Sequence, residues 1–295
     1  MNPIISLYNV IINSISILKK QKTVSEKTSI LFYYFKLSAT WLFAVKILGI
    51  KKNKEKIFGR TMHFFDYEVF SWLFYEMFIR QEYMFTTTTK NPVIIDCGSN
   101  IGMSVLFFKK LFPTSKIICF EPNHDTAELL KQNISENKFE GITCHEAAVT
   151  DNKGVIPFYV DKTKKGILAM STINDLKNHN ADAMETTVRT VQLSQYIKEP
   201  VDFLKLDIEG AETCVIEDLS KHKKLQDIER IFIEYHFSVK NKKNSVAKIT
   251  QILEENGFYM LFNCLQEPPF EQYQEKPYNL LIYAYKKKII LIKRI

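Results

Sequence analysis

The chain has 295 residues, of which 46% are hydrophobic and 25% charged, and it carries a net charge of +7. These fractions are typical of a folded globular protein and exclude a disordered or collagen-like chain. Five cysteines without a CxxC pair argue against a secreted disulfide scaffold and favour free thiols in the cytoplasm.

The positive charge is concentrated at the two ends of the chain. Residues 1–90 have 13 basic and 6 acidic side chains, residues 91–285 have 22 and 27, and residues 286–295 have 5 and none. An enzyme that acts on nucleic acid usually carries basic surface beside its active site, so we expect no nucleic-acid partner. Basic ends mixed with apolar residues fit a peripheral contact with the inner membrane face or a homodimer contact, although solvated lysines explain them more simply.

The first part of the chain predicts helices. Ile4–Leu18 has the spacing of an amphipathic helix. Ser29–Ile50 is long enough to span a membrane, but Lys36 and Lys46 would each cost about 2.5–3.5 kcal/mol there, so we expect an amphipathic or buried helix. Phe64–Met84 predicts another helix, which packs on a partner.

From Pro92 onward, short apolar runs alternate with helical segments. This alternation predicts an α/β fold with a largely parallel sheet and helices on both faces. We expect strands at Val93–Cys97, Lys116–Phe120, Ile142–Val149, Phe203–Leu206, Arg230–Phe237, Phe258–Phe262 and Leu280–Tyr285, and helices at Met103–Phe112, His124–Asn137, Ala211–Ser220 and Val246–Asn256.

Residues 151–190 interrupt this alternation, because Val155–Val160 and Thr187–Gln192 predict two added strands. The predicted organisation is a helical N-terminal extension at 1–90, an α/β domain at 91–285 with a β-rich insertion at 151–190, and a basic tail at 286–295.

The first predicted strand and the turn after it indicate a binding site. Asp96 lies near the strand end, and Gly98 and Gly102 follow it. Glycine adopts positive φ and lets a ligand approach the backbone beside the next helix N-terminus. Ligands of such sheets bind at the carboxyl ends of the strands, where Glu121 ends the second strand and could accept hydrogen bonds from two ribose hydroxyls.

The glycine spacing favours one cofactor class over another. A dinucleotide site has the pattern G-x-G-x-x-G, whereas this turn has only Gly98 and Gly102, with Asp96 before them. A carboxylate repels pyrophosphate but attracts the ammonium group of S-adenosylmethionine. The pattern favours S-adenosylmethionine over NAD, and the alternatives are an NAD-dependent oxidoreductase and a non-catalytic binding module of the same fold.

The sequence resembles the FkbM-type methyltransferases from about Glu68 to Tyr285. The resemblance rests on IIDCGSNIG (94–102), FEPN (120–123), AAV (147–149), LKLDIEGAE (204–212) and IEYH (233–236). It implies a Rossmann-like class I methyltransferase sheet, S-adenosylmethionine as cofactor, and a sugar or polyol hydroxyl as substrate.

The resemblance also implies which residues contact the cofactor. Ser99 stands where relatives often have Ala, and Tyr83, just before the first strand, either closes over the cofactor or packs on the core. The candidate cofactor residues are Asp96, Gly98, Ser99, Asn100, Gly102, Glu121, Pro122, Ala148 and Tyr83.

Acidic residues and one histidine follow the later strands. A sugar hydroxyl barely ionises at neutral pH, so a base or a metal must assist the loss of its proton. Glu234 and His236 share one face of a strand, and histidine titrates near neutrality. The candidate catalytic residues are His236, Asp207, Glu234 and Glu209. Glu212 is a further acidic residue in the same region that could assist.

The acidic residues could instead hold Mg²⁺, and the sequence leaves the base and metal routes open. The expected function is S-adenosylmethionine-dependent O-methylation of a carbohydrate hydroxyl. The acceptor would be a bacterial surface or protein-linked glycan, or its precursor.

Overall fold

The computed structural model describes residues 23–161, 183–237, 241, 243–264 and 278–286. The predicted helix at Ile4–Leu18 and residues 287–295 of the predicted basic tail lie outside these residues. Lys286 is the last residue of a strand, and its Nζ donates hydrogen bonds to the carbonyl oxygens of Leu225 and Gln226, both at 2.8 Å.

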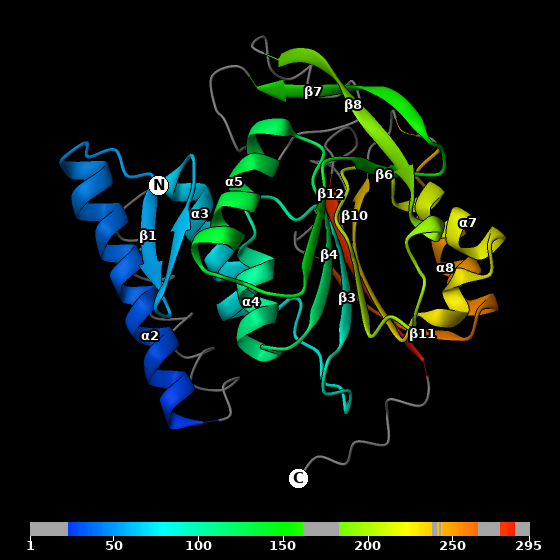
Figure 1. The fold of residues 1–295 in the computed structure, drawn as a ribbon, viewed down its shortest axis with the longest axis horizontal. Helices are drawn as coiled ribbons and strands as arrows, with labels where there is room; N and C mark the ends of the chain where they lie inside the picture. Colours follow the sequence, from blue (N-terminus) through cyan, green and yellow to red (C-terminus); the bar gives the residue numbers. More distant parts are fainter. Residues whose placement is uncertain (1–22, 162–182, 238–240, 242, 265–277, 287–295) are drawn as a thin grey trace, which may run out of the picture.

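A seven-stranded sheet forms the centre of the molecule, with strand order β11-β12-β10-β9-β3-β4-β5 (Figure 1). Among these strands only β12 runs antiparallel to its neighbours. The strand order reverses between β3 and β9, which is where such sheets bind ligands. The strands are β3 (Val93–Cys97), β4 (Lys116–Phe120), β5 (Ile142–His145), β9 (Phe203–Leu206), β10 (Arg230–Phe237), β11 (Phe258–Cys264) and β12 (Tyr278–Lys286).

Helices cover both faces of this sheet, as Figure 1 shows. Residues alternate between the two faces along each strand, so Ile94 and Phe203 pack in one hydrophobic cluster, whereas Ile95 and Leu204 pack in the other. The predicted Rossmann-like α/β fold is therefore confirmed. The helices are α4 (Met103–Leu111) and α5 (His124–Glu136) on one face, and α7 (Glu212–Lys221) and α8 (Val246–Glu255) on the other, with 3-10 turns η3 (Leu193–Gln195) and η4 (Lys224–Asp227).

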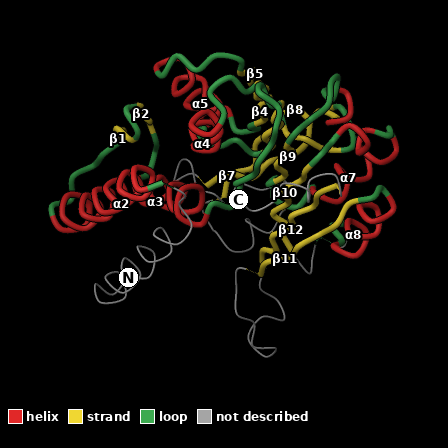
Figure 2. The backbone as a smooth tube through the Cα atoms, turned by 90° about the horizontal axis from the view of Figure 1, so that it is seen from below, coloured by secondary structure: helices red, strands yellow, loops and turns green. Residues whose placement is uncertain are grey.

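An additional layer packs outside α4 and α5 (Figures 1 and 2). It consists of helix α2 (Val24–Ala39), which continues into the π-helix η1 (Thr40–Ile47), strands β1 (Lys54–Ile57) and β2 (Arg60–His63), helix α3 (Tyr67–Phe74) and the π-helix η2 (Tyr75–Arg80). Its aromatic residues, among them Phe70, Phe74 and Phe78, join the same hydrophobic cluster as α4.

Two predictions for this layer are wrong in part. Residues 54–63 form a hairpin, not a helix, because Phe58 (φ 49°) and Gly59 (φ 76°) both adopt the left-handed conformation that two-residue hairpin turns require. The predicted helix Phe64–Met84 begins at Tyr67 and ends before Gln81, whose φ of 58° terminates it. Tyr83 consequently follows the helix.

The predicted insertion is a small three-stranded sheet of order β6-β8-β7. Its strands are β6 (Ala148–Thr150), β7 (Gly154–Asp161) and β8 (Ala183–Gln192), and β7 and β8 pair antiparallel. The predicted strand Ile142–Val149 is wrong in its extent, because it divides into β5 of the central sheet and β6 of the small one.

Candidate active site

The glycine loop after β3 is tightly fixed between neighbouring elements. Gly98 has a φ of 86°, and a Cβ on it would lie 2.0 Å from the carbonyl oxygen of Asp207. Gly102 has a φ of 87°, and a Cβ there would lie 2.6 Å from a methyl group of Leu130. Both positions therefore require glycine, for backbone conformation and for close approach.

Asp96, near the end of β3, holds this loop through hydrogen bonds and an ion pair. Its side chain is fully buried, and its Oδ2 accepts a hydrogen bond of 2.6 Å from the Ser104 hydroxyl. Lys205 Nζ lies 3.5 Å from the other carboxylate oxygen, and the Ser99 hydroxyl donates to the Asp96 carbonyl oxygen at 2.8 Å. Burying a carboxylate is costly without such partners, so they hold it in place.

Glu121 lies at the end of β4, against the glycine loop. Its Oε2 accepts a hydrogen bond from the backbone N–H of Asn100, and its Oε1 accepts one from that of Asn123, both at 3.0 Å. Burial raises the pKa of Glu121 to about 7, although these hydrogen bonds act in the opposite direction. Each carboxylate oxygen keeps a lone pair for a ligand hydroxyl. Pro122 separates Glu121 from Asn123, which caps α5.

Tyr83 and Ala148 lie within packed regions. The ring of Tyr83 packs edge-on against Phe232, with centroids 4.8 Å apart, and Lys205 Nζ lies 5.3 Å from the Tyr83 centroid. Ala148 packs with Phe158 and other apolar residues of the small sheet. A cofactor contact at either residue stays a prediction.

Three of the four candidate catalytic residues surround one nitrogen atom of the fourth, His236. Its Nε2 lies 3.5 Å from Glu209 Oε2, 3.8 Å from Asp207 Oδ1 and 3.8 Å from Glu234 Oε1. Asp207 and Glu209 follow β9, whereas Glu234 and His236 are two residues apart on β10. Adjacent parallel strands bring these side chains to the same edge of the sheet.

The other ring nitrogen of His236, Nδ1, contacts a buried carboxylate. Nδ1 lies 3.0 Å from Oε1 of the fully buried Glu212, which also accepts the backbone N–H of Gly210. Asn244 Nδ2 donates to Glu212 Oε2 at 2.6 Å and to the His236 carbonyl oxygen at 3.0 Å. The carboxylate of Glu212 therefore orients the ring. The sequence prediction missed Asn244.

Negative charge dominates the environment of His236. Burial raises the pKa of Glu209 to about 8 and, with the charge of Asp207, that of Glu234 to about 7. Burial alone would lower the pKa of His236, but Glu209 and Glu212 reverse this effect and hold the pKa well above its usual value. The cluster favours an additional positive charge or an imidazolium.

Lys205 joins the glycine loop to the His236 cluster. Its ammonium group is fully buried and donates a hydrogen bond of 2.8 Å to the Gly98 carbonyl oxygen. The same nitrogen atom lies 3.0 Å from Asp207 Oδ2. Burial lowers its pKa, but the charges of Asp207 and Asp96 raise it by more. A lysine inside the apolar strand Phe203–Leu206 was the sequence signal for this contact, since buried lysines need partners.

Among the residues that the structure describes, two groups of side chains could hold a metal ion. The ligand atoms of Asp207, Glu209 and His236 lie within 4.8 Å of one another. A nitrogen ligand with carboxylates suits Mn²⁺, Fe²⁺ or Zn²⁺ better than Mg²⁺, which prefers oxygen ligands.

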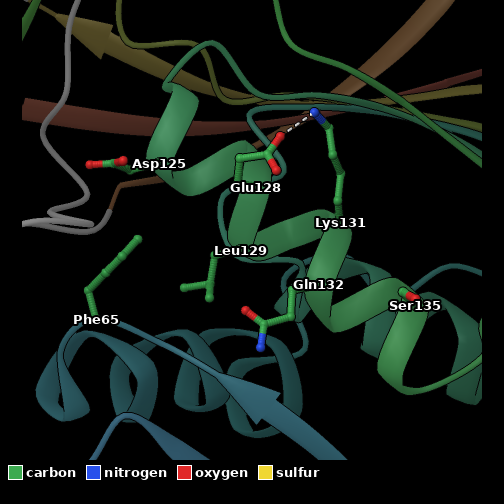
Figure 3. Close-up of a pocket in the computed structure, with 7 residues that line it drawn as sticks. All are labelled: Phe65, Asp125, Glu128, Leu129, Lys131, Gln132 and Ser135. Carbon is green, nitrogen blue, oxygen red and sulfur yellow. Dashed lines mark hydrogen bonds and ion pairs between the residues drawn. The ribbon is translucent and has the colours of Figure 1, made fainter.

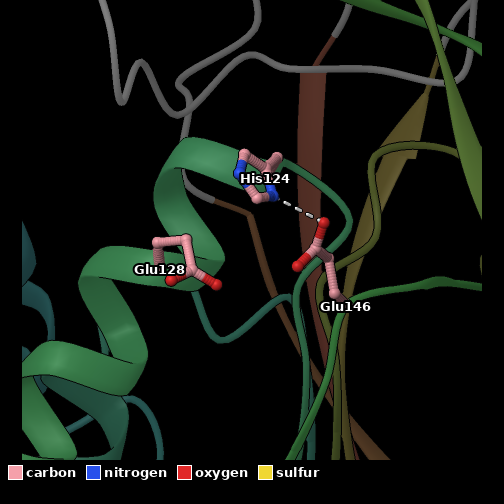
Figure 4. A group of neighbouring side chains, drawn as sticks. All are labelled: His124, Glu128 and Glu146. Atoms are coloured by element: carbon pink, nitrogen blue, oxygen red, sulfur yellow. Dashed lines mark hydrogen bonds and ion pairs between the residues drawn. The ribbon is translucent and has the colours of Figure 1, made fainter.

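The second group lies on the surface and consists of His124, Glu128 and Glu146 (Figure 4). His124 Nδ1 lies 2.8 Å from Glu146 Oε1, and Lys131 Nζ lies 2.7 Å from Glu128 and 3.3 Å from Glu146. Lys131 supplies positive charge to both glutamates, so this group is a surface ion-pair network.

Figure 3 shows a hollow beside α5, in which Phe65 faces the helix. Its lining comprises Phe65, Asp125, Glu128, Leu129, Lys131, Gln132 and Ser135. None of the candidate cofactor or catalytic residues lines it, so the hollow is separate from the candidate active site.

The fold defines a Rossmann-like α/β protein, and its candidate ligand site lies at the carboxyl ends of β3, β4, β9 and β10. The methyltransferase FkbM domain matches residues 96–260, which is more than half of the chain, and the chain therefore belongs to the FkbM methyltransferase family.

Curated relatives include "Methyltransferase 1" of Beauveria bassiana, which is 27% identical over 224 residues, covering 70% of this chain and 86% of the relative. "2-O-methyltransferase NoeI" of Sinorhizobium fredii is 28% identical over 139 residues, covering 43% of this chain and 56% of the relative. Among solved structures, an FkbM methyltransferase from Methylobacillus flagellatus aligns with a TM-score of 0.45 and 12% identity, covering 93% of this chain and 58% of that one.

Proposed function

We propose that this chain transfers the methyl group of S-adenosylmethionine to a hydroxyl group of a carbohydrate. The observation that carries the proposal is the buried Lys205, whose ammonium group contacts both the glycine loop at Gly98 and the catalytic cluster at Asp207. A cofactor on the loop and an acceptor at His236 would consequently lie side by side.

The glycine loop and Glu121 are the residues that would hold the cofactor, which supplies a methyl group on a positively charged sulfur. The bare backbone at Gly98 and Gly102 allows close approach, and the Glu121 carboxylate would accept hydrogen bonds from the ribose hydroxyls. The negative charge of Asp207 would favour the sulfonium, and Glu209 and Glu234, with pKa values raised to about 8 and about 7, would add negative charge as they ionise. These features support S-adenosylmethionine over NAD.

The unprotonated form of His236 would accept the proton of the acceptor hydroxyl at Nε2. Because the neighbouring carboxylates hold the pKa of His236 well above its usual value, the rate would increase as the pH rises. As the new O–CH₃ bond forms and the S–CH₃ bond breaks, the hydroxyl proton passes to the imidazole. Glu212 holds Nδ1–H and so directs Nε2 towards the acceptor, while Asp207 and Glu209 stabilise the imidazolium that results. Most of the rate would come from positioning.

A carbohydrate suits the acceptor side because carboxylates arranged around one nitrogen can accept several hydroxyl hydrogen bonds. The resemblance of the five sequence blocks favours sugar or polyol hydroxyls, and one relative bears the name 2-O-methyltransferase. We propose a bacterial surface or protein-linked glycan or its precursor as the acceptor, methylated in the cytoplasm.

The test uses methyl-labelled S-adenosylmethionine with a panel of monosaccharides, oligosaccharides and lipid-linked precursors. Label on a carbohydrate, with a mass gain of one CH₂ group, is the expected result. EDTA could abolish the wild-type rate, and Mg²⁺ or Mn²⁺ could restore it. That result would assign the activation of the hydroxyl to a metal ion held by Asp207, Glu209 and His236, in place of general-base catalysis by His236. Label on RNA or protein side chains, with none on carbohydrate, would contradict the proposed acceptor.

A further inference from the structure

The outer face of the helix formed by α2 and η1 is unusually apolar. Val24, Phe32, Phe35, Phe43 and Ile47 follow the helical repeat along this side, and their exposed fractions range from 50% to 76%. In Figure 1, α2 lies at the left edge of the molecule, on the side of β1 that is remote from the central sheet. Leu48 and Ile50 extend the apolar surface into the next turn. We call this set the outer face.

The opposite side of the same helix already attaches it to the protein. Ile30 and Leu37 are buried in the main hydrophobic cluster, and the ring of Tyr33 packs edge-on against Phe58 with centroids 4.6 Å apart. Lys36 Nζ lies 2.7 Å from Glu55 Oε1 on β1. The helix therefore remains docked without any contribution from the outer face, which is available for a different contact.

Basic residues adjoin the outer face. Residues 24–60 contain eight basic and two acidic side chains, a net charge of +6. Lys46 on η1 and Lys51 just after the helix are exposed, whereas Lys54 and Lys56 alternate on β1 with Glu55, which faces the helix, and so point to the other side of the hairpin. Of the two acidic residues, Glu55 is buried between Lys36 and Lys52, so it does not offset the exposed lysines. An apolar stripe beside exposed lysines complements the acyl chains and headgroups of an anionic membrane.

The helix is also long enough to span a membrane, since Val24–Ile47 has 24 residues and its most apolar stretch of 18 residues has a mean hydropathy of 1.3. However, a spanning helix would have to leave the core contacts of Ile30 and Leu37 and separate Lys36 from Glu55. An orientation parallel to the membrane surface keeps these contacts and immerses only the outer face.

We propose that this outer face binds the interfacial region of an anionic membrane, with α2 and η1 lying parallel to the surface. The proposal does not depend on the reaction catalysed. It places the docking surface on the outer face of α2 and η1 and on the adjoining Lys46 and Lys51.

The test is sedimentation of the full-length protein with phosphatidylcholine vesicles, with and without phosphatidylglycerol. We expect binding to the anionic vesicles that weakens from low to physiological salt. The triple variant Phe32→Ser, Phe35→Ser, Phe43→Ser should bind about tenfold less or weaker still, because its apolar insertion is lost. The variant Lys46→Gln, Lys51→Gln should weaken the preference for anionic vesicles.

The matched control is Tyr259→Ser, Leu261→Ser, Phe262→Ser, which removes three exposed apolar residues from β11. It should bind as the wild type does, and circular dichroism and thermal melting verify that all variants fold. Absence of wild-type binding at low salt, or equal losses in the control and the phenylalanine variant, would overturn the proposal. So would resistance of the bound protein to alkaline extraction, which indicates a spanning helix. A wild-type dimer that the phenylalanine variant dissociates, without vesicle binding, would identify a second copy as the occupant.

Discussion

His236 and His124 each lie among carboxylates whose ligand atoms are within 4.8 Å of the imidazole, but the two clusters differ in their surroundings. His236 Nδ1 contacts the fully buried Glu212, and Asn244 donates a hydrogen bond to the same carboxylate. His124 is exposed on α5, and its neighbours are also paired with a flexible lysine. Similar residue types therefore make a positioned site in one place and a solvated ion-pair network in the other.

The largest expected difference between the clusters is in turnover. His236→Ala should lower the rate of methyl transfer by about 10²–10⁴-fold, because it removes the proposed general base. His124→Ala should leave the rate within about twofold, since exposed ion pairs contribute little. Release of S-adenosylhomocysteine measures both. Equal losses of rate in the two variants would show that the buried position of His236 does not contribute to catalysis.

Glu121 lies three residues before His124, but its carboxylate contacts the glycine loop at Asn100. Glu121→Ala should raise the dissociation constant of S-adenosylhomocysteine about 30- to 1000-fold, because charge-assisted hydrogen bonds to the ribose are lost. The neighbouring variant Glu128→Ala serves as the control and should change it less than about twofold. An unaltered affinity in folded Glu121→Ala protein would remove this residue from the site.

Asn244 tests whether the buried support of His236 also stabilises the fold. Asn244→Ala removes the 2.6 Å donor of Glu212 Oε2 and the 2.7 Å acceptor of the Thr213 hydroxyl, so it should lower the free energy of unfolding by about 2–3 kcal/mol. Urea unfolding measures the change. A loss below about 0.5 kcal/mol, the size expected for a surface contact, would contradict the assigned role.

The pH dependence of cofactor binding should follow Glu121. Burial raises its pKa from 4.5 to about 7, so its contribution to stability is full below pH 4.5 and declines as the pH rises through about 7. Ribose hydroxyls would bind the ionised form. The affinity for S-adenosylhomocysteine should therefore increase about tenfold between about pH 6 and about pH 8. Glu121→Gln should flatten this increase, and an equally steep profile in that variant would assign the titration to another group.

The smallest effect is expected at the surface cluster. Glu146→Gln weakens the contacts with His124 and Lys131, and it should change the free energy of unfolding by no more than about 0.5 kcal/mol. Urea unfolding in parallel with Asn244→Ala gives the direct contrast. A loss as large as that of Asn244→Ala would mean that exposure does not separate the two clusters.

The sequence predicted the features that local patterns determine. The strand Val93–Cys97, the two glycines and the shared face of Glu234 and His236 all follow from short-range spacing, and the structure has them in place. The hairpin of β1 and β2 escaped prediction because its turn is Phe58-Gly59, in which a bulky residue adopts positive φ. A non-glycine residue rarely does so.

Asn244 could not be predicted in the same way. Its partner Glu212 is 32 positions earlier in the chain, and only the packing of α7 beside the loop after β10 brings them together. For α2 the length of the apolar run and the lysines within it predicted an amphipathic or buried helix, whereas the identity of its exposed side depends on where Ile30 and Leu37 are buried. Long-range contacts and the choice of buried face therefore required the structure.

Calorimetric titration with S-adenosylhomocysteine tests the central claim most directly. The account predicts saturable one-to-one binding to the wild type, loss of binding in Glu121→Ala, retention in His236→Ala and no binding of NAD. Binding of NAD in place of S-adenosylhomocysteine, or loss of S-adenosylhomocysteine binding in His236→Ala with retention in Glu121→Ala, would contradict the assigned division between cofactor loop and catalytic cluster.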